Sequence, residues 1–484
     1  MYGAYQHGKL SASDRLPENK CSSRIIVTTR IETVAKASSV SENLVHHMKS
    51  LEVCRVHDMM LEVMVSKSRD ANFVTLVGRQ YEVGLSGSKV RRLTVHDNDG
   101  KDHISSHKKE VEQPHHARHG IETMNLQQVR SLTIFQSKGL ERLLDRLGEF
   151  KLLRVLDLEH CKALQDKHMR DVCRLYLLRF LSLRGTSISV VPSKIGDLEY
   201  LETLDIGSRK ICTMPPTVTK LRRLEHLRVS RWTMPRGLGN MKALREVSWA
   251  LLEGDVQDAR EIGELQQLQV LCIFVAKSEE EFSRALGSSL TLSKTCALQS
   301  LRLRSTRTLD FLLHVSSPPP LLCHLTMIGP ISRFPDWISS LKHLTEFSAT
   351  FVELAGDQIL DSLSKLPSLQ SIQLGYRSCR DRELAARTTH NFPALRILDL
   401  YLAREHPKVV KFEQGSMTKL ETLLLQFSEE ERSIVGLENL KNLKKVKLSG
   451  WKNYPPLERA VERLKVESEN RPKSNQIKVV VRSW

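Results

Sequence analysis

The sequence predicts an α/β solenoid of about fourteen stacked repeats, and two observations lead to this fold class. The first is a Leu-x-x-Leu-x-Leu spacing, seen from Leu153 to Leu158, that returns through most of the 484 residues. The second is its step, about 20 to 30 residues, close to that of leucine-rich repeats. The first apolar anchors of the units are Val129, Leu153, Leu178, Leu201, Leu224, Leu244, Leu268, Leu298, Leu322, Leu344, Leu369, Leu395, Leu420 and Leu443.

Each unit is expected to contain one strand with an apolar and an open face. Leu181 and Leu183 lie two residues apart and so face one side of a strand, while Phe180, Ser182 and Arg184 face the other. One unit cannot bury its leucines alone, so neighbouring units must stack and share a long core. The result is a curved solenoid whose strands form one open surface.

The open face of these strands is the predicted site of function, because its side chains are not needed for packing. Arginine and aromatic side chains are common anchors of protein interfaces. The alternative for any one of these positions is an ordinary solvated strand residue. The candidate positions are Asp157, Phe180, Arg184, His226, Arg228, Phe274, Arg302, Arg304, Tyr401, Lys445 and Lys447.

Charge and composition limit the other classes of partner. The formal net charge is +17, and residues 441–484 contribute twelve Lys or Arg against four Glu. A basic end can bind nucleic acid or acidic lipid, but no groove-reading motif accompanies it, so a solvated end is preferred and no specific nucleic-acid partner is expected. The predicted partner is a protein.

The segments that would indicate export or a membrane are missing from the sequence. It has no apolar run of about 18 residues and no signal peptide at Met1, so no transmembrane segment is expected. The nine cysteines are scattered without a C-x-x-C pair, as expected for reduced thiols. The expected location is the cytoplasm, with the nucleus and a peripheral membrane position as alternatives.

No arrangement of residues predicts catalysis or a metal site. The sequence lacks a local Ser/His/Asp, Cys/His or paired-carboxylate motif, so no enzyme is expected. Five histidines between Asp102 and Gly120 lack paired ligand spacing, which favours a polar linker over a metal site.

Two motifs stand before the repeats. Residues 23–30, Ser-Arg-Ile-Ile-Val-Thr-Thr-Arg, predict a buried strand of a parallel sheet that ends at Arg30, where such sheets bind ligands. Residues 56–64 place apolar side chains at the spacing of one helix face, next to His57 and Asp58. A short strand over residues 72–78 would close a small winged-helix-like unit.

These motifs resemble those of plant intracellular immune receptors that join a nucleotide-binding (NB-ARC) domain to leucine-rich repeats. The segment ending at Arg30 resembles the RIIVTTR motif, and Val56-His57-Asp58 resembles the methionine-histidine-aspartate motif. Residues 89–95 resemble the segment that leads into the repeats of the cereal coiled-coil class. The resemblance implies that Arg30 senses the terminal phosphate of ATP and that His57 contacts ADP.

The same resemblance predicts a truncated and internally deleted receptor. A Gly-x-x-x-x-Gly-Lys-Ser/Thr phosphate loop is missing, and only about 26 residues separate Arg30 from His57. We therefore expect no nucleotide cofactor, no nucleotide-driven oligomer, and recognition of a pathogen effector, a host protein or the domains of a related receptor. The alternatives are an ADP/ATP switch, as in intact family members, and a non-switching adaptor or decoy.

The expected segments follow from these patterns. Ser193 to Tyr200 predicts an eight-residue helix returning the chain to the next strand, and Lys277 to Phe282 predicts the acidic start of a helix. After the last repeat, a helix from Pro455 and a strand over residues 477–481 should cover its exposed end. The segments are 1–20, a disordered start; 21–50, a nucleotide-binding fragment; 51–88, a winged-helix-like fragment; 89–128, a first strand and polar linker; 129–451, the solenoid; and 452–484, the cap.

Overall fold

A computed structural model describes most of the chain beyond residue 124. The chain divides into two compact units, residues 1–66 and 67–484, and every described residue belongs to the second unit. Arg30, His57 and the histidines of residues 102–120 lie outside the described residues. The described ranges are 75–77, 90–96, 125–135, 141–207, 212–291, 297–401, 407–426, 433–452, 454–472 and 476–483.

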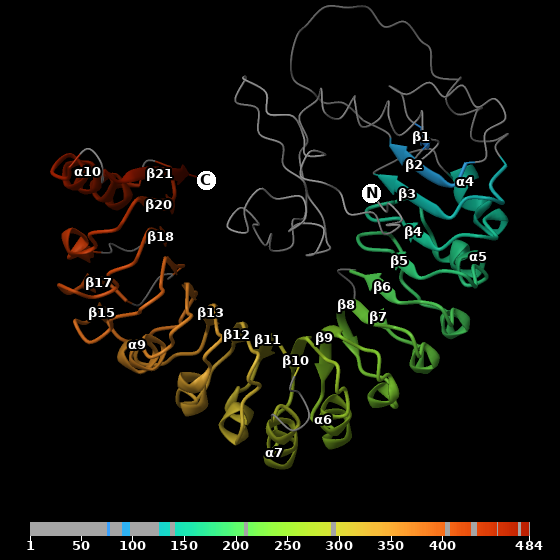
Figure 1. Cartoon of the computed structure of the whole chain (residues 1–484), viewed down its shortest axis with the longest axis horizontal. Coiled ribbons are helices and arrows are strands. Elements are labelled where there is room, and N and C mark those ends of the chain that lie inside the picture. Colours follow the sequence, from blue (N-terminus) through green and yellow to red (C-terminus); the bar gives the residue numbers. More distant parts are fainter. Residues whose placement is uncertain are drawn as a thin grey trace, which may run out of the picture. The chain divides into compact units, whose positions relative to one another are not determined.

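One long parallel sheet organises this unit, with 18 strands among the described residues. Neighbouring strands come from successive repeats and pair in parallel. Figure 1 shows the strands along the inner side of the repeats and the helices along the outer side. The strands are β1 (Thr75–Val77), β2 (Arg92–His96), β3 (Ser131–Phe135), β4 (Val155–Asp157), β5 (Phe180–Ser182), β6 (Thr203–Ile206), β7 (Cys212–Thr213), β8 (His226–Thr233), β9 (Glu246–Leu252), β10 (Val270–Val275), β11 (Ser300–Ser305), β12 (His324–Ile328), β13 (Glu346–Thr350), β14 (Ser371–Leu374), β16 (Ile397–Leu400), β18 (Thr422–Gln426), β20 (Lys445–Gly450) and β21 (Lys478–Ser483).

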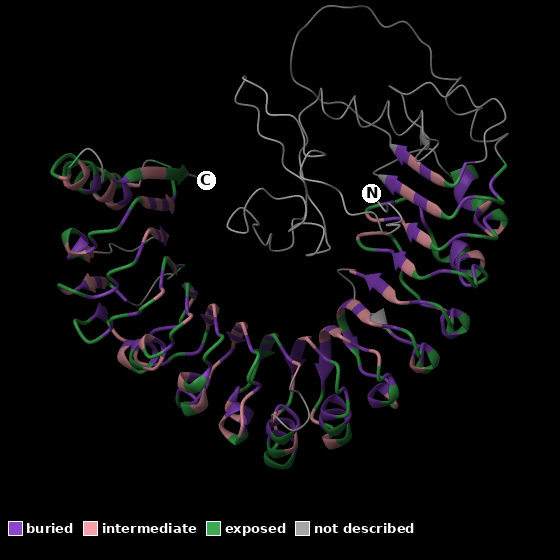
Figure 2. Ribbon diagram, in the orientation of Figure 1, coloured by how far each residue is buried: buried purple, intermediate pink, exposed green. Residues whose placement is uncertain are grey.

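The leucine spacing explains the core. All fourteen predicted anchors are no more than 1% exposed, and each lies two residues before a strand of the sheet. In β11, for example, Leu301 and Leu303 are buried while Arg302 and Arg304 are exposed. Figure 2 shows the same alternation along the inner strands. Because a fully buried leucine contributes about 1.5–3 kcal/mol, the repeated anchors and the other buried leucines of each unit together favour stacking. The predicted solenoid of leucine-rich repeats is confirmed.

Short helices return the chain from one strand to the next on the outer side, and most are 3-10 helices. The expected eight-residue helix from Ser193 to Tyr200 is wrong, because η5 ends at Asp197 after five residues. A 3-10 helix rises further per residue than an α-helix, so it spans a short return with fewer residues. The helices are α4 (Glu141–Asp145), η3 (Leu147–Glu149), η4 (Asp166–His168), α5 (Met169–Val172), η5 (Ser193–Asp197), η6 (Pro216–Lys220), η7 (Leu238–Asn240), α6 (Val256–Gly263), α7 (Glu280–Ser289), η8 (Asp310–His314), η9 (Asp336–Ser340), α9 (Gly356–Ser364), η10 (Leu437–Asn439) and α10 (Pro455–Glu469).

The longest repeat carries a regular α-helix, as its acidic start predicts. Helix α7 begins at Glu280 and has Glu280 and Glu281 in its first turn, where carboxylates interact favourably with the helix dipole. Phe282 and Leu286 are buried against the core. The extra residues of this repeat therefore build outer structure and leave the inner sheet in register.

Three repeats near the C-terminus carry a second sheet on their outer side. Its strands β15 (Glu383–Ala386), β17 (Val409–Phe412) and β19 (Ser433–Val435) are parallel and adjacent. The sequence contains no clear pattern for this sheet. Its strands are three or four residues long, too short for a periodic pattern to stand out from the surrounding loops.

The two ends of the main sheet are closed differently. Strand β1, which the sequence assigns to the winged-helix-like fragment of residues 51–88, pairs in parallel with β2 and lies at one edge of the repeat sheet. At the other edge, β21 pairs with β20, and α10 precedes it. Arg471 secures this end, because its guanidinium donates to the carbonyl oxygens of Leu437 and Leu440 at 2.8 and 3.1 Å. The predicted helix and final strand are both present.

Candidate protein-recognition surface

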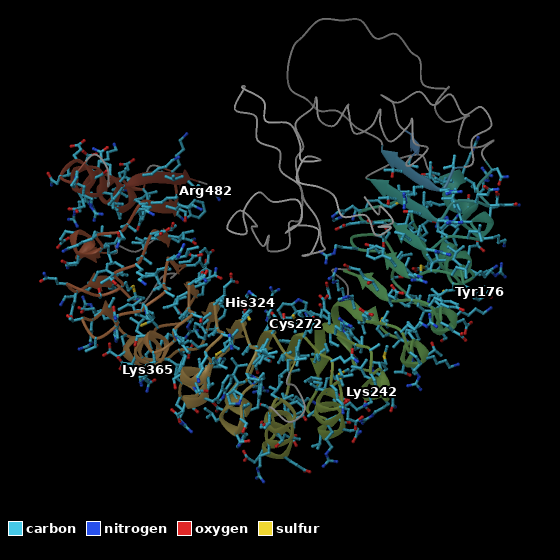
Figure 3. The ribbon with its side chains drawn as sticks, viewed as in Figure 1. Tyr176, Lys242, Cys272, His324, Lys365 and Arg482 are labelled. Atoms are coloured by element: carbon cyan, nitrogen blue, oxygen red, sulfur yellow. The ribbon has the colours of Figure 1, made fainter. Side chains whose placement is uncertain are left out.

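The candidate residues lie on the inner strands or at their carboxyl ends. Open-face side chains of neighbouring strands lie beside each other, as Phe180 does with Thr203 and Arg302 with Thr326, except where the register shifts between β8, β9 and β10. Figure 3 shows Cys272 and His324 on the inner side, and Tyr176 and Lys365 on the outer side. The sheet thus presents rows of side chains that run across many repeats, and polar and aromatic groups gather at several places along them.

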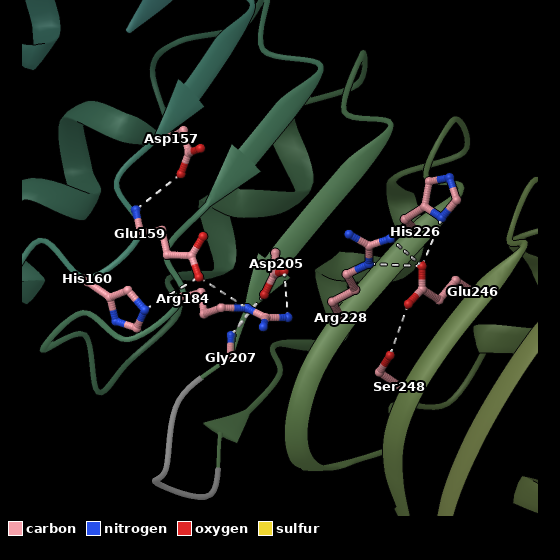
Figure 4. Close-up of polar contacts among 10 residues, drawn as sticks. All are labelled: Asp157, Glu159, His160, Arg184, Asp205, Gly207, His226, Arg228, Glu246 and Ser248. Atoms are coloured by element: carbon pink, nitrogen blue, oxygen red, sulfur yellow. Dashed lines mark hydrogen bonds and ion pairs between the residues drawn. The ribbon is translucent and has the colours of Figure 1, made fainter. Parts of the chain in front are cut away.

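The first group joins Asp157, Arg184 and Asp205 with Glu159 (Figure 4). Arg184 lies 3.3 Å from Asp205 Oδ2 and 3.8 Å from Glu159 Oε1. Asp157 accepts a hydrogen bond from the Glu159 amide at 3.1 Å. Burial raises the pKa of Asp157, against hydrogen bonds that lower it. Arg184 therefore neutralises an acidic group of this chain and is only partly available to a partner.

The second group is an ion cluster around Glu246 (Figure 4). Its Oε2 atom lies 3.1 Å from His226 Nδ1 and 2.8 Å from the Arg228 guanidinium. Burial alone would raise the pKa of Glu246, but hydrogen bonds and charges from His226 and Arg228 outweigh it and lower the pKa to about 2. The carboxylate thus stays charged well below neutral pH, and Arg228 is held in a fixed internal pair.

The third group places Phe274 between two arginines. The Arg231 and Arg304 guanidinium carbons lie 5.3 and 5.5 Å from its ring centroid. Phe274 is on the predicted face, but it is only 9% exposed because the guanidinium groups cover it. Cation–π contacts of this kind hold the arginines in place. The exposed contact surface here includes Arg231, Arg304 and Arg302. The Arg302 side chain has no hydrogen bond or ion pair to the described residues.

The fourth group, the aromatic cluster, consists of Phe351, Tyr376 and Tyr401 at the carboxyl ends of β13, β14 and β16. The Phe351 and Tyr376 rings are stacked at 6.2 Å, and the Tyr376 and Tyr401 rings meet edge to face at 4.6 Å. The two tyrosine hydroxyl groups lie 2.9 Å apart. Phe351 remains 42% exposed and Tyr401 37% exposed. Three successive repeats therefore present one ordered aromatic surface to solvent.

The backbone of the aromatic cluster is unusual. Phe351 has a φ of 59°, a left-handed conformation that is costly for residues with a Cβ. Its amide donates to the Tyr376 carbonyl at 2.6 Å, which compensates part of that cost. Beside it, Glu353 and Arg377 form a 3.0 Å ion pair and also have positive φ. Such strain tends to occur at functional sites.

Sequence reasoning identified Tyr401 but missed Phe351 and Tyr376. Like Tyr401, both lie one or two residues after their strands, at the carboxyl ends of β13 and β14. Their recurrence at the strand end in neighbouring repeats is a signal that the sequence does contain. The left-handed conformation that turns Phe351 outward leaves no such signal, because no glycine marks it.

The C-terminal candidates form a basic edge. Lys445 and Lys447 alternate with buried Val446 and Leu448 on β20, and Lys445 is in register with Lys478 of β21. Lys445 and Lys447 lie on the open face of β20, while Phe180 is half-buried on β5. Some predicted residues share a repeat, as His226 and Arg228 do on β8, but together they extend from β4 to β20, so they belong to an extended surface with several clusters.

Two findings concern other classes of site. Within the described ranges, no three His, Cys, Asp or Glu side chains gather in a way that could hold a metal ion. Among the helices of those ranges, none combines the length and apolar character needed to cross a membrane.

Comparison with known proteins identifies the family. A protein-family model described as a leucine-rich repeat region matches residues 128–475 of this chain. Solved structures with a similar repeat include a leucine-rich repeat protein of Leptospira interrogans (16% identity, TM-score 0.40, 73% of this chain and 96% of that chain). An internalin of Listeria monocytogenes is a second (17% identity, TM-score 0.38, 63% and 82%).

Similar proteins by sequence are plant disease resistance proteins. Pik-2 of Oryza sativa subsp. japonica is 28% identical over 470 residues, covering 84% of this chain and 44% of that protein. RGA4 of the same rice is 27% identical and covers 95% of this chain and 45% of its own length. The RPP8-like protein 3 of Arabidopsis thaliana is 26% identical, with 85% and 45% covered. This chain spans less than half the length of these relatives. It belongs to the leucine-rich repeat family, and the resemblance to plant disease resistance proteins is confirmed.

Proposed function

We propose that this chain is the recognition part of a plant immune receptor and binds a protein through the open face of its repeat sheet. Its relatives are disease resistance proteins, which supports a role in defence. The partner class is a pathogen effector, a host protein, or domains of a related receptor. Recognition without any nucleotide switch, as in an adaptor or decoy, uses the same surface.

The aromatic cluster is the observation that supports this proposal most strongly. Tyrosine and phenylalanine supply large contact areas with few rotatable bonds, so little entropy is lost when a partner covers them. Ring contacts and the bond between the tyrosine hydroxyl groups already order the cluster. An ordered aromatic surface flanked by the ion pair of Glu353 and Arg377 has the apolar centre and polar rim of protein interfaces.

Removing the aromatic cluster should weaken partner binding without unfolding the repeats. In a pull-down from infected plant tissue, Tyr376→Ala with Tyr401→Ala should reduce retention of the specific partner by about tenfold or more, as for hot-spot residues. Tyr176→Ala is the matched control, because Tyr176 is 58% exposed on the outer side. Unchanged melting temperatures would exclude misfolding.

Direct contact can be checked with a photo-crosslinking phenylalanine in place of Tyr376 or Tyr176. The same partner should form a covalent adduct at position 376 and none at position 176. Equal retention by both alanine variants, or adducts at both positions, would contradict recognition through the aromatic cluster.

We also propose that ADP and ATP are not cofactors of this chain. The sequence lacks a phosphate loop, and the spacing from Arg30 to His57 is too short for the helical domain that separates these motifs in the resembled receptors. Titration of labelled ADP should show no saturable micromolar binding, and His57→Ala should bind no differently. Micromolar binding that His57→Ala abolishes would restore the switch model.

A further inference from the structure

A cavity of about 530 Å³ lies between the outer sheet and the C-terminal helix, away from the inner strands. It is bordered by the amino ends of β15, β17 and β19 and by one face of α10, which Figure 1 places on the outer side of the last repeats. A volume of this size suits a small-molecule ligand. Nothing in the proposed protein recognition uses this cavity.

The outer sheet places two cations and a hydroxyl group in a row. Arg382, Lys408 and Ser433 stand at the starts of three adjacent parallel strands. The Lys408 amide donates to the Arg382 carbonyl at 2.7 Å, and the Ser433 amide to the Lys408 carbonyl at 2.9 Å. The register of the strands therefore brings these three residues together at one wall of the cavity.

Helix α10 supplies the opposite wall. Arg459 and Arg463 lie four residues apart and so project from the same face of the helix. Like charges at this spacing destabilise a helix by a few tenths of a kcal/mol. Between the two walls, Leu437 and Leu464 are 9% and 1% exposed and contribute an apolar base. The cationic groups thus surround a preformed hollow on folded elements.

The charge balance of the cavity favours an anion. Its lining includes four cationic side chains and, among the described residues, no aspartate or glutamate. Arg382 and Arg463 form no hydrogen bond or ion pair through their side chains with any other described residue. Arginine forks match phosphate oxygens in bidentate geometry, and Ser433 can donate a further hydrogen bond.

We propose that this cavity binds a compact polyanion carrying phosphate groups, held between Arg382 on the sheet and Arg463 on the helix. Lys408 and Arg459 add positive charge, and Ser433 contacts a phosphate oxygen. Because the ligand bridges the last repeats and the C-terminal helix, its binding stabilises that end of the solenoid. The site is separate from the aromatic cluster and does not depend on recognition of a protein.

The test uses tripolyphosphate as the probe on the full chain, by calorimetry and thermal melting at 150 mM salt. The wild type should bind in a saturable way and melt at a higher temperature with the probe. Arg382→Gln with Arg463→Gln should weaken binding at least tenfold. The matched control is Arg170→Gln with Arg260→Gln, two exposed arginines on outer helices that remove the same charge. The control should bind within about twofold of the wild type.

Equal weakening by both pairs would overturn the proposal, because it would indicate attraction by net charge alone. Absence of saturable binding at this salt concentration would also overturn it. Vesicles of phosphatidylcholine with a phosphoinositide, compared with the soluble headgroup, separate the two sources of clustered phosphate. If the ligand is a free molecule, the soluble headgroup should compete with tripolyphosphate for the cavity. Binding to vesicles without competition by the soluble headgroup would exclude a soluble ligand. Unliganded melting temperatures of the variants should match the wild type, which keeps folding and binding distinguishable.

Discussion

Trp232→Ala is expected to lower the free energy of unfolding by about 3–5 kcal/mol, the range for removing a large aromatic side chain from a core. Trp232 lies on β8, is fully buried, and is the largest side chain of the core. Its Nε1–H group donates to the Ser248 carbonyl of the next repeat at 2.8 Å. The substitution therefore removes both packing and a bond between repeats, which urea denaturation would measure.

Two further variants separate these contributions. Trp232→Phe keeps much of the ring but leaves the Ser248 carbonyl without its donor, so it should cost about 1–3 kcal/mol. Trp451→Ala removes a tryptophan that is 54% exposed and should cost less than about 1 kcal/mol. If Trp232→Ala were no more destabilising than Trp451→Ala, the repeats around β8 would not depend on this contact.

The repeat architecture was predictable because it depends on a pattern that each unit repeats. Leu153, Leu156 and Leu158 are all fully buried, as their spacing requires, and the same holds for Leu178 and its successors. Every unit reinforces the same inference, so an irregular unit does not obscure it. The asymmetry between inward leucines and outward variable positions then follows from strand geometry alone.

The outer side was less predictable because its structure is local and short. Pro192 and Pro335 stand directly before five-residue 3-10 helices, and after Pro192 the sequence predicts a longer helix of eight residues. Strand β17 was missed because its four residues gain stability only from β15 and β19, which lie about 25 residues away on either side. Pairings of that range cannot be read from one segment.

On the candidate surface, the strand position of a side chain is predictable from the sequence, but its ion-pair partner is not. Arg228 and Arg302 occupy equivalent places on their strands, and the sequence treats them alike. The structure places Arg228 beside Glu246, whereas Arg302 has no such partner among the described residues. Which arginine is available to another protein depends on its neighbour one repeat away. That neighbour is determined by which residues of adjacent strands lie side by side, and the order of residues within one repeat does not show this.

After Trp232→Ala, Gly436→Ala should have the next largest effect on the free energy of unfolding. It acts on the outer sheet, beside the cavity between that sheet and α10. Gly436 follows β19 with a φ of 83°, which costs about 1–2 kcal/mol for a residue with a Cβ. A Cβ at this position would also overlap the Phe412 carbonyl oxygen of β17. A backbone atom cannot move aside as a side chain can, so the total cost should be about 3 kcal/mol or more.

Gly415→Ala is the matched control for this prediction. Gly415 has nearly the same φ, 82°, but its Cβ would meet only the Thr388 methyl group at 3.8 Å. It should therefore show the conformational cost of about 1–2 kcal/mol without the overlap. Hydrogen exchange should accelerate in β17 and β19 for Gly436→Ala alone, and thermal melting should rank the two variants in the same order. If Gly436→Ala and Gly415→Ala lowered the free energy of unfolding equally, the outer sheet would accommodate the added methyl group. The contact between Gly436 and β17 would then not determine the shape of the cavity.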